Sequence, residues 1–472
     1  MVAMFDSTIA AVASPAGSGG IVIIRISGPG SIQIAASIFR PAAKASNRQP
    51  TPESFTSHRL YYGHIVDQHG GRALDEVLLA VMRAPRSYTR EDVVEINCHG
   101  GPAAVQAVLD LILRSGARLA EPGEFTRRAF MNGRIDLTQA EAVIDVINAR
   151  TQQALEAATA QVCGAFRREL EDVRGVLIDM LVRNEAAIDF PEDDDVKEDS
   201  DLGAMISSLR QKAIEPIAQL IRNYHDGRPV REGLNVAIAG RPNVGKSSLM
   251  NRLLARERAI VTPHPGTTRD AIEDEFLLKG IAVRLWDTAG LHASEDPIES
   301  IGMQKTLERM EHADLILFLL EAHKPVCVED DEIYNKIRPK TVLFVLNKID
   351  LVGESVPLAV IPDGWVEASL IPVSALTGQG IETLRDIILK RATGAGCLEK
   401  SPTIIPNLRQ KALLEGCLRS AEAAADSVEK CESPELVDIN LRQAIDYIDK
   451  TLGISVGPEI IDRIFDRFCI GK

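Results

Sequence analysis

Five short segments, in a fixed order, constrain the fold of this chain more than any other feature of its sequence. They are Gly240–Ser247 (GRPNVGKS), Thr267–Thr268, Asp287–Gly290 (DTAG), Asn347–Asp350 (NKID) and Ser374–Ala375. The first follows a strand-like stretch and precedes a helix-like one, which is the context that a phosphate-binding loop requires. Strands alternate with helices through this region, so we expect a mostly parallel sheet with helices on both faces.

The segment Gly240–Ser247 predicts a cradle for nucleotide phosphates. Its backbone N–H groups and the N-terminus of the following helix attract anions. We expect Lys246 to reach the β- and γ-phosphates and Ser247 to ligate Mg²⁺. Thr268 is the second expected magnesium ligand, and Asp287 is the carboxylate expected to hold the ion through water.

The segment Asn347–Asp350 predicts that the base is guanine. The Asp350 carboxylate can accept hydrogen bonds from the guanine ring N–H and the neighbouring amino group, an edge that adenine lacks. A backbone N–H at Ser374–Ala375 is expected to contact the guanine oxygen. The predicted ligand is therefore GTP with magnesium. The residues expected to contact GTP are Asn243, Val244, Gly245, Lys246, Ser247, Ser248, Thr262, Thr267, Thr268, Asp287, Thr288, Ala289, Gly290, Asn347, Lys348, Asp350, Ser374 and Ala375.

The sequence leaves the mode of hydrolysis open. Leu291 stands directly after the DTAG segment, where Ras-like GTPases carry a glutamine that orients the attacking water. No arginine stands out as a finger either. The segment Asp296–Glu299 offers a carboxylate, and Asn243 offers a side-chain oxygen that could help to hold a monovalent cation beside the phosphates. Asn243 could equally be an ordinary turn residue.

Composition restricts the partners and the compartment. A formal net charge of −14 excludes binding to nucleic acid by bulk attraction, so an RNA partner would need a local basic patch or a second protein. No apolar run approaches the length of a membrane span, and no signal peptide is evident, so we expect a cytoplasmic protein without membrane contact. The seven cysteines include no CxxC pair, and we expect reduced, mostly buried thiols.

Two regions of the chain predict α/β folds. In residues 1–125, strands are expected at Ile21–Ile26 and Val93–Asn97, with a helix at Pro102–Arg114. Residues 229–395 carry the strand–helix alternation of the nucleotide segments. Further strands in this second region are expected near 272–278, 281–286, 314–320, 341–346 and 370–373.

Residues 126–228 and 396–472 predict an all-α domain whose two parts flank the nucleotide domain in sequence. Thr138–Glu141 reads as a capping box that opens a long helical stretch continuing through Ile188. Its expected apolar face carries Val143, Ile144 and Ile147.

Two further features complete the helical pattern. Another helix is expected from Leu202 to Tyr224, after a solvated acidic turn at Asp189–Asp195. Near the end of the chain, Ser433–Pro434 reads as a cap followed by proline at the first helical position. We infer that the nucleotide domain is inserted into the helical domain.

Further motifs extend these segments or lie outside them. They are Ile24–Gly28, Gly100–Pro102, Pro122–Phe125 with Arg128–Phe130, Ala187–Phe190, Gly240–Ser248, Gly266–Asp270 and the C-terminal Phe468–Lys472 (FCIGK). On these motifs the chain resembles the bacterial and organellar MnmE (TrmE) family of tRNA-modification GTPases, over essentially its whole length. The C-terminal motif is especially specific, because free termini rarely match by chance.

The resemblance implies a homodimer. Each chain would contain an N-terminal α/β folate-binding and dimerising domain (1–125), a discontinuous helical domain (126–228 and 396–472) and an inserted Ras-like G domain (229–395). The G domains would meet when K⁺ and the GTP transition state are present. A flavin-binding partner of the MnmG (GidA) family is implied. Together they would add an aminomethyl or carboxymethylaminomethyl group to C5 of a tRNA wobble uridine, with 5-formyl- or 5,10-methylene-tetrahydrofolate supplying the carbon.

The resemblance also assigns roles near the phosphates. It makes Glu299 the catalytic residue that positions or activates water, the alternative being an ordinary surface acid. Pro297–Ile298 precedes it and departs from an uninterrupted acidic helix. The K⁺ ligands implied are Asn243, Thr262, His264 and Thr267, with main-chain oxygens as the expected donors of the loop Thr262–Thr267.

By position, the folate derivative would bind Arg25, Glu95, Arg134 and Lys472. A pterin presents a ring N–H beside an amino group, and a carboxylate such as Glu95 is the natural receptor for that pair. Arg25 and Arg134 are permanent cations that could meet the anionic tail or ring oxygens of folate, although surface salt bridges are the alternative for both. Cys469 is expected to be a packed thiol rather than a nucleophile, because no neighbouring base is evident.

Two other functions remain open on the sequence alone. A ribosome-assembly GTPase of the Era/EngA kind would share the GRPNVGKS loop and the missing glutamine, but it would need a basic RNA-binding module that nothing here resembles. A folate-dependent one-carbon transferase regulated by GTP is permitted by residues 1–125 taken alone.

Overall fold

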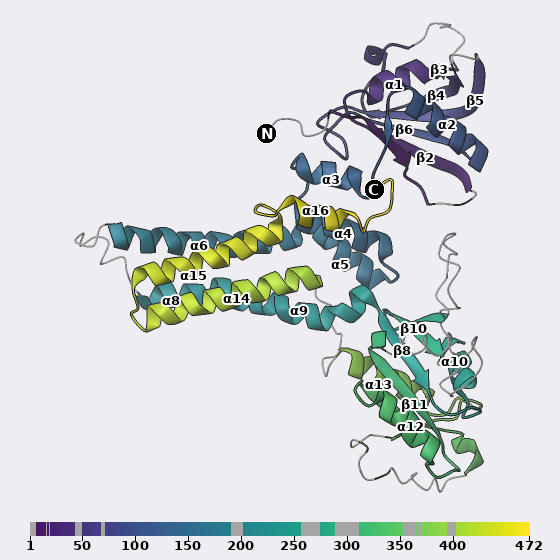
Figure 1. The fold of residues 1–472 in the computed structure, drawn as a ribbon, viewed down its shortest axis with the longest axis vertical. Coiled ribbons are helices and arrows are strands. Elements are labelled where there is room, and N and C mark those ends of the chain that lie inside the picture. Colours follow the sequence, from purple (N-terminus) through teal and green to yellow (C-terminus); the bar gives the residue numbers. More distant parts are fainter. Residues whose placement is uncertain are drawn as a thin grey trace.

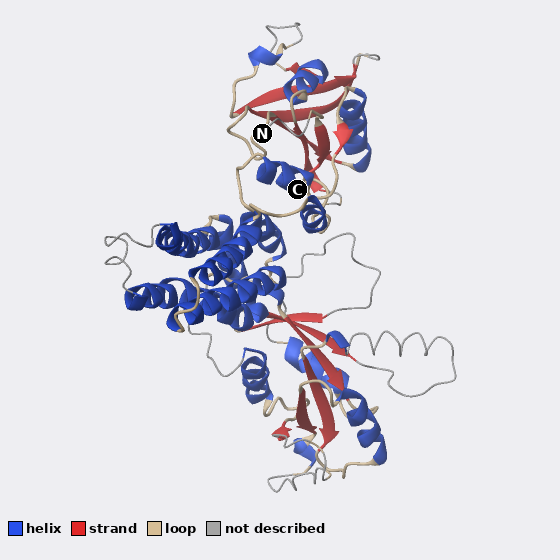
Figure 2. Ribbon diagram, turned by 60° about the vertical axis from the view of Figure 1, so that its left-hand side comes forward, coloured by secondary structure: helices blue, strands red, loops and turns tan. Residues whose placement is uncertain are grey.

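The computed structural model describes most of the chain. The described residues are 6–15, 17, 19–42, 50–67, 71–189, 202–255, 274–287, 311–352, 362, 365, 370–393 and 403–472. They form a seven-stranded sheet, a helical bundle and a six-stranded sheet. In Figure 1 the bundle lies between the two sheets, and the C-terminus returns to the side of the first sheet. Figure 2 shows the same succession, with helices alone in the middle part.

The N-terminal sheet has the strand order β3-β4-β5-β6-β2-β1-β7 and is antiparallel except for the β1–β7 pair. Its strands and helices are β1 Ile9–Val12, β2 Gly19–Ser27, α1 Ser31–Ile38, β3 Phe39–Pro41, β4 Arg59–Asp67, β5 Arg72–Met82, β6 Val93–Gly100, α2 Pro102–Arg114 and β7 Arg118–Leu119. The two expected strands lie inside β2 and β6, and the expected helix matches α2 in both bounds.

Helices α1 and α2 cover one face of this sheet, whereas on the other face Phe125 packs against Ile9 and Ala11 of β1. Side chains alternate along a strand, so Ile24 and Ile96 point into a core with Val108 of α2 and Ile34 of α1. The opposite face carries large apolar side chains in solvent. They are Ile21, Leu60, Tyr62 and Leu78, at 68, 66, 55 and 41% exposure. Register places Tyr62 beside Leu78.

The helical bundle joins segments on either side of the six-stranded sheet. Its helices are α3 Glu124–Met131, α4 Leu137–Asn148, α5 Gln152–Val162, α6 Ala165–Asp189, α8 Leu202–Leu209, η2 Arg210–Ile214 (a π turn), α9 Glu215–Glu232, α14 Leu408–Glu429, α15 Pro434–Leu452 and α16 Pro458–Phe465. One core combines Phe166, Leu170 and Ile217 with Leu414 and Leu441. Side chains from before and after the nucleotide region therefore share a core.

Several helix predictions need correction. The capping box at the start of α4 uses Asp136 and Gln139: Gln139 N donates to Asp136 Oδ1 at 3.0 Å, and Asp136 N donates to Gln139 Oε1 at 3.1 Å. Thr138 instead donates to Asp136, and Glu141 accepts from Arg409. Thr138 lies two residues after the N-cap and is already inside the helix, whereas Asp136 has the extended backbone of an N-cap.

The long helix expected through Ile188 is three separate helices, α4, α5 and α6. The second break falls at Gly164, whose φ of 83° a helix cannot accommodate. Ile147 is 45% exposed and does not share a buried face with Val143 and Ile144. The helix expected to end at Tyr224 continues to Glu232. Ser433 is an N-cap followed by proline as predicted, but its side chain makes no capping hydrogen bond.

The six-stranded sheet has the order β13-β12-β11-β8-β10-β9, and only β9 is antiparallel to its neighbour. Its elements are β8 Leu234–Ala239, α10 Lys246–Leu254, β9 Asp274–Leu278, β10 Ile281–Asp287, β11 Leu315–Glu321, α12 Val328–Ile337, β12 Val342–Asn347, η3 Ile349–Leu351, β13 Leu370–Pro372 and α13 Ile381–Thr393. Alternate β11 side chains pack against α10 and α13 on one face and α12 on the other. The predicted doubly wound sheet is confirmed.

Three other expectations can be compared with the fold. Among the described cysteines, Cys98 and Cys417 are buried, and burial raises their pKa to about 11 and about 12. Cys163, Cys431 and Cys469 are exposed, so two expectations are wrong for the described residues: that the thiols are mostly buried, and that Cys469 is packed. Over the same residues no helix is long and apolar enough to cross a membrane. The expected acidic turn lies outside the described residues beyond Asp189.

Candidate nucleotide and cofactor sites

The described nucleotide segments meet at the carboxyl edge of the six-stranded sheet. The strands β8, β10, β11, β12 and β13 are parallel, so their carboxyl ends point the same way. Register pairs Asp287 with Ile238, and Glu321 with Asn347. Ligands of open α/β sheets bind at this edge. The sheet therefore brings together segments that lie far apart in the sequence.

The phosphate-binding loop has a backbone that side chains rarely allow. Gly240 has a φ of 148° and Gly245 a φ of 101°. Asn243 also has a left-handed φ, 63°, which asparagine tolerates better than most residues. Lys246, in the first turn of α10, donates from Nζ to the carbonyls of Gly240 at 2.8 Å and Arg241 at 3.0 Å. The ammonium group thus lies against the loop, where it is expected to meet phosphate.

Asn347 begins the guanine segment (Asn347–Asp350) and connects the phosphate-binding loop with Ser374–Ala375. It is 1% exposed, and its Nδ2 donates to the carbonyl of Val244 at 2.8 Å. Its Oδ1 accepts from the backbone N–H of Ala375 at 3.1 Å. One buried amide therefore ties the first segment to the last, which is a structural role that the motif alone did not reveal.

Asp350 and Ser374 lie together, as the expected guanine site requires. The buried Ser374 hydroxyl donates to Asp350 Oδ1 at 2.5 Å and orients the exposed carboxylate. Ser374 Oγ also accepts from the N–H of Thr377 at 3.1 Å. Asp350 is therefore held by a serine from a neighbouring strand end, and its exposed carboxylate can accept further hydrogen bonds.

The remaining expected GTP, Mg²⁺ and K⁺ residues lie outside the described part of the chain. They are Thr262, His264, Thr267, Thr268, Thr288, Ala289, Gly290 and Glu299, and the side chain of Asp287 is not described either. Their roles remain predictions. Within the described residues, no group of three or more His, Cys, Asp or Glu side chains could hold a metal ion.

Arg25 and Glu95 lie on the face of the N-terminal sheet opposite α1 and α2, with the C-terminal backbone beside them and Arg134 connected through Tyr88. Arg25 on β2 is the register partner of Glu95 on β6, and its Nε donates to Glu95 Oε1 at 2.8 Å. The two side chains are 16 and 23% exposed. Arg25 also donates to the carbonyl of Gly471 at 3.4 Å, and the N–H of Phe125 donates to the Lys472 carbonyl at 3.1 Å. The C-terminus therefore lies beside the pair.

Tyr88 connects the two expected folate arginines. The Cζ atom of Arg25 lies 5.5 Å from the centre of the Tyr88 ring, and that of Arg134 lies 4.7 Å from it. Arg134 Nη1 also donates to the Tyr88 carbonyl at 3.2 Å. A ring face stabilises nearby guanidinium groups. The sequence analysis missed Tyr88, because a single aromatic residue in a loop gives no signal of its contacts.

A buried ion network holds the Tyr88 loop in place. Arg128 is fully buried and donates to both oxygens of Glu91 at 3.1 Å and to Glu124 at 2.9 Å. Tyr88 Oη lies 2.9 Å from Thr126 Oγ1. A buried arginine needs such partners, because an unpaired buried charge is strongly destabilising. The motifs around residues 122–130 thus fix the loop that carries Tyr88, next to the candidate folate site.

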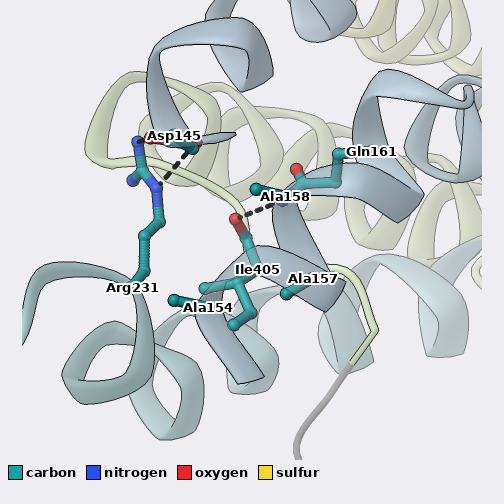
Figure 3. Close-up of a pocket in the computed structure, with 7 residues that line it drawn as sticks. All are labelled: Asp145, Ala154, Ala157, Ala158, Gln161, Arg231 and Ile405. Carbon is teal, nitrogen blue, oxygen red and sulfur yellow. Dashed lines mark hydrogen bonds and ion pairs between the residues drawn. The ribbon is translucent and has the colours of Figure 1, made fainter. Parts of the chain in front are cut away.

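A small pocket marks the junction between the helical bundle and the six-stranded sheet (Figure 3). Arg231 at the end of α9 grips Asp145 of α4 with Nε–Oδ2 and Nη2–Oδ1 distances of 3.0 and 2.9 Å. Ala154 and Ala157 of α5 line the pocket and belong to the core of the sheet. No expected GTP or folate residue lines it. We interpret the pocket as part of the contact between the helical bundle and the six-stranded sheet.

The order of the sheet and the motifs at its carboxyl edge define the class: a P-loop protein with a Ras-like GTPase domain. The comparisons with known proteins are specific beyond that class. A family model described as "GTP-binding protein TrmE N-terminus" matches residues 8–134, and one described as "MnmE helical domain" matches residues 137–469.

Whole-length relatives carry one name. The "tRNA modification GTPase MnmE" of Carboxydothermus hydrogenoformans is 44% identical over 99% of this chain and 100% of its own length. That of Syntrophobacter fumaroxidans is 43% identical over 98% of each chain. This chain belongs to the MnmE family of tRNA modification GTPases.

Solved structures give a weaker likeness. A crystal structure of an Aquifex aeolicus Era variant bound to GDP and aluminium fluoride is 32% identical and covers 40% of this chain and 66% of its own, with a TM-score of 0.30. A TM-score of 0.30 is too low to support a comparison of function. The whole-length relatives therefore decide between the alternatives, and the ribosome-assembly GTPase is not supported.

Proposed function

We propose that this chain is the potassium-dependent GTPase of a system that modifies C5 of the tRNA wobble uridine. The observation that carries the proposal is the left-handed Asn243 in the phosphate-binding loop, at φ 63°, in a chain with Leu291 at the usual glutamine position. A bound cation beside Asn243 would make good the missing positive charge. Modification of a tRNA would place the protein in the cytoplasm.

The described residues fit a magnesium–GTP ligand. Ser247 is an exposed residue in the first turn of α10, and it would hold Mg²⁺ together with Thr268. Magnesium neutralises charge on the β- and γ-phosphate oxygens. Lys246 would exchange its two loop carbonyls for phosphate oxygens. Asp350, oriented by Ser374, would select guanine.

Asn243 suits a monovalent cation. Its side chain is exposed at the phosphate edge, and an amide oxygen is a hard, neutral donor of the type that K⁺ accepts. Thr262, His264 and Thr267 would complete the site, chiefly through main-chain oxygens. Potassium supplies there the charge that an arginine finger supplies elsewhere. Glu299 would position the attacking water.

The face of the N-terminal sheet that carries Arg25 and Glu95 fits a folate derivative. Glu95 is partly accessible and could accept the paired donors of a pterin, which 5-formyl- or 5,10-methylene-tetrahydrofolate both carry. Arg25, Arg134 and Lys472 would meet ring oxygens and the anionic tail. The folate supplies the one-carbon unit, and this chain's residues bind and orient it.

The same face supports a homodimer. Ile21, Leu60, Tyr62 and Leu78 present large apolar side chains to solvent beside Arg25 and Glu95. Exposed apolar patches of this kind mark protein contacts. A second copy would cover the patch and close the folate site. A flavoprotein partner of the MnmG (GidA) family would provide the redox step, and it would also help a chain of net charge −14 to meet tRNA.

Three measurements test the proposal. The GTPase rate of the purified chain should be higher in potassium than in sodium at equal ionic strength, and the flavoprotein should change it. Wobble uridines of tRNA from cells lacking the protein should lose the C5 group. Equal rates in both salts refute the potassium dependence. An intact wobble uridine refutes the place in tRNA modification, and folate turnover without the flavoprotein would instead favour a GTP-regulated one-carbon transferase.

A further inference from the structure

Glu321 is a buried carboxylate at the nucleotide edge that none of the five segments includes. It ends β11 and is 5% exposed. It is the register partner of Asn347, and the next residue, Ala322, donates its N–H to the Asn347 carbonyl at 2.8 Å. The backbone that carries Glu321 is therefore fixed to the strand that leads into the guanine segment.

Two lysines satisfy this carboxylate. Lys324 Nζ lies 2.7 Å from Glu321 Oε2, and Lys348 Nζ pairs with Oε1. Burial alone would raise the pKa of Glu321, but the hydrogen bonds from Lys324 and Lys348 outweigh it and lower the pKa to about 2. Lys348 is 29% exposed and Lys324 is 52% exposed, so the two lysines differ in how firmly their surroundings hold them.

Lys348 makes a second contact that Lys324 lacks. Its Nζ donates to the main-chain carbonyl of Asn243 at 2.7 Å. Both Lys348, at φ 65°, and Asn243, at φ 63°, have left-handed backbones. Such conformations persist only where the surroundings hold them. A chain of contacts thus runs from Glu321 through one ammonium group to the backbone of the proposed cation ligand.

We propose that Glu321 is a positioning residue that clamps Lys348 onto the carbonyl of Asn243 and so sets the direction of the Asn243 side chain toward the phosphates. The inference rests on the proposed potassium role of Asn243 for one of its readouts. Its other readout is the release of GDP, which can be measured whether or not Asn243 binds potassium. Glu321 acts through Lys348 and touches neither nucleotide nor ion.

Removing the charge should loosen this clamp without removing bulk. In Glu321→Gln the side chain keeps its shape, but Lys348 loses its ionic partner. The Lys348 ammonium group is then held less firmly at the Asn243 carbonyl. We expect GDP to dissociate about tenfold faster, since a charged hydrogen bond of this kind is worth roughly one such factor. The potassium concentration for half-maximal stimulation should rise by a similar factor.

The second lysine that contacts Glu321, Lys324, provides the control. Lys324→Met removes the other, more exposed lysine, which makes no described contact with the nucleotide segments, and we expect both quantities to stay within about twofold. Glu321→Asp, which keeps the charge, should recover part of the loss. Thermal unfolding of each variant separates a general loss of stability from a change at the site.

A double-mutant cycle decides whether Glu321 works through Lys348. Release of a fluorescent GDP analogue would be measured for Glu321→Gln, Lys348→Met and the pair. We expect Glu321→Gln to add little once Lys348 is absent, because their effects share one contact. Additive effects overturn the inference, and so does unchanged release in Glu321→Gln. A wild-type chain indifferent to potassium would refute the proposed function, while GDP release would still test the clamp.

Discussion

A Cβ atom added to Gly245 would lie 2.3 Å from Nδ2 of Asn347. That amide is held on both sides, by the Val244 carbonyl and the Ala375 N–H, so it cannot turn aside without breaking the brace between the phosphate loop and the guanine segment. The guanine segment (Asn347–Asp350) therefore leaves no room for a side chain at Gly245.

Gly245→Ala should abolish GTP binding. Besides the contact with Asn347, the φ of 101° disfavours any side chain by on the order of 1–2 kcal/mol. The measurement is GTP affinity by calorimetry. Gly175→Ala in α6, where an added Cβ meets nothing within 4 Å, is the matched control and should raise the unfolding free energy by about 0.5–1 kcal/mol. Near-normal GTP affinity of Gly245→Ala would contradict the brace.

Asn243→Ala should remove the stimulation of GTP hydrolysis by potassium while changing GTP affinity only a few-fold, because backbone groups hold the phosphates. Alanine also tolerates the φ of 63° poorly. Asn243→Gly is therefore the cleaner variant, since it keeps the backbone and removes only the amide. Rates in potassium and in sodium would be compared for both. Persistent potassium stimulation in Asn243→Gly would sink the cation assignment.

Glu299→Ala should slow GTP turnover by about 10²-fold or more with little change in GTP affinity, as for loss of a group that acts on the water. Single-turnover hydrolysis and equilibrium binding separate the two quantities. Asp296→Ala, three residues away in the same acidic segment, is the control and should hydrolyse GTP at the normal rate. A normal rate in Glu299→Ala would return this residue to the surface acids.

Tyr88→Leu should weaken binding of 5-formyl-tetrahydrofolate by about tenfold. The ring that lies 4.7 Å from Arg134 Cζ and 5.5 Å from Arg25 Cζ would be lost, and both cations would lose their common support. Tyr88→Phe keeps the ring and should retain most of the affinity, losing only the contact with Thr126. Binding would be followed by calorimetry, with GTP turnover as a check on folding. Equal folate affinity in the leucine variant would exclude Tyr88 from the site.

The stabilising effect of Glu321 should depend on pH in a defined direction. Its pKa falls from an ordinary value of 4.5 to about 2 on folding, with burial opposing and the two lysines dominating the change. A lowered folded-state pKa contributes stability above the unfolded pKa, and this contribution is lost as the pH falls toward the folded value. The gap in unfolding free energy between wild type and Glu321→Gln, up to about 3 kcal/mol, should therefore narrow from about pH 5 to about pH 3. A constant gap would show that the pKa of Glu321 does not change on folding, and so that the two lysines do not stabilise its charge.

The strands that carry the nucleotide segments were predictable, because each is a short aliphatic run that ends in a motif. β12 and the segment Asn347–Asp350 are an example: the run predicted at 341–346 is found at Val342–Asn347. Helix boundaries were less predictable. Thr138 and Asp136 can both serve as caps in a sequence, and only the backbone of the folded chain decides which of them is extended.

The sequence by itself determined the family of the chain, the doubly wound sheet and the segments expected to bind the nucleotide, because these depend on local residue order. Only the tertiary structure placed Tyr88 against Arg25 and Arg134, and Glu321 against Lys348. Those contacts join residues far apart in the chain, and they follow from strand register and from burial, which a linear pattern does not contain. The roles proposed for Tyr88 and Glu321 depend on neighbours that only packing brings into contact with them.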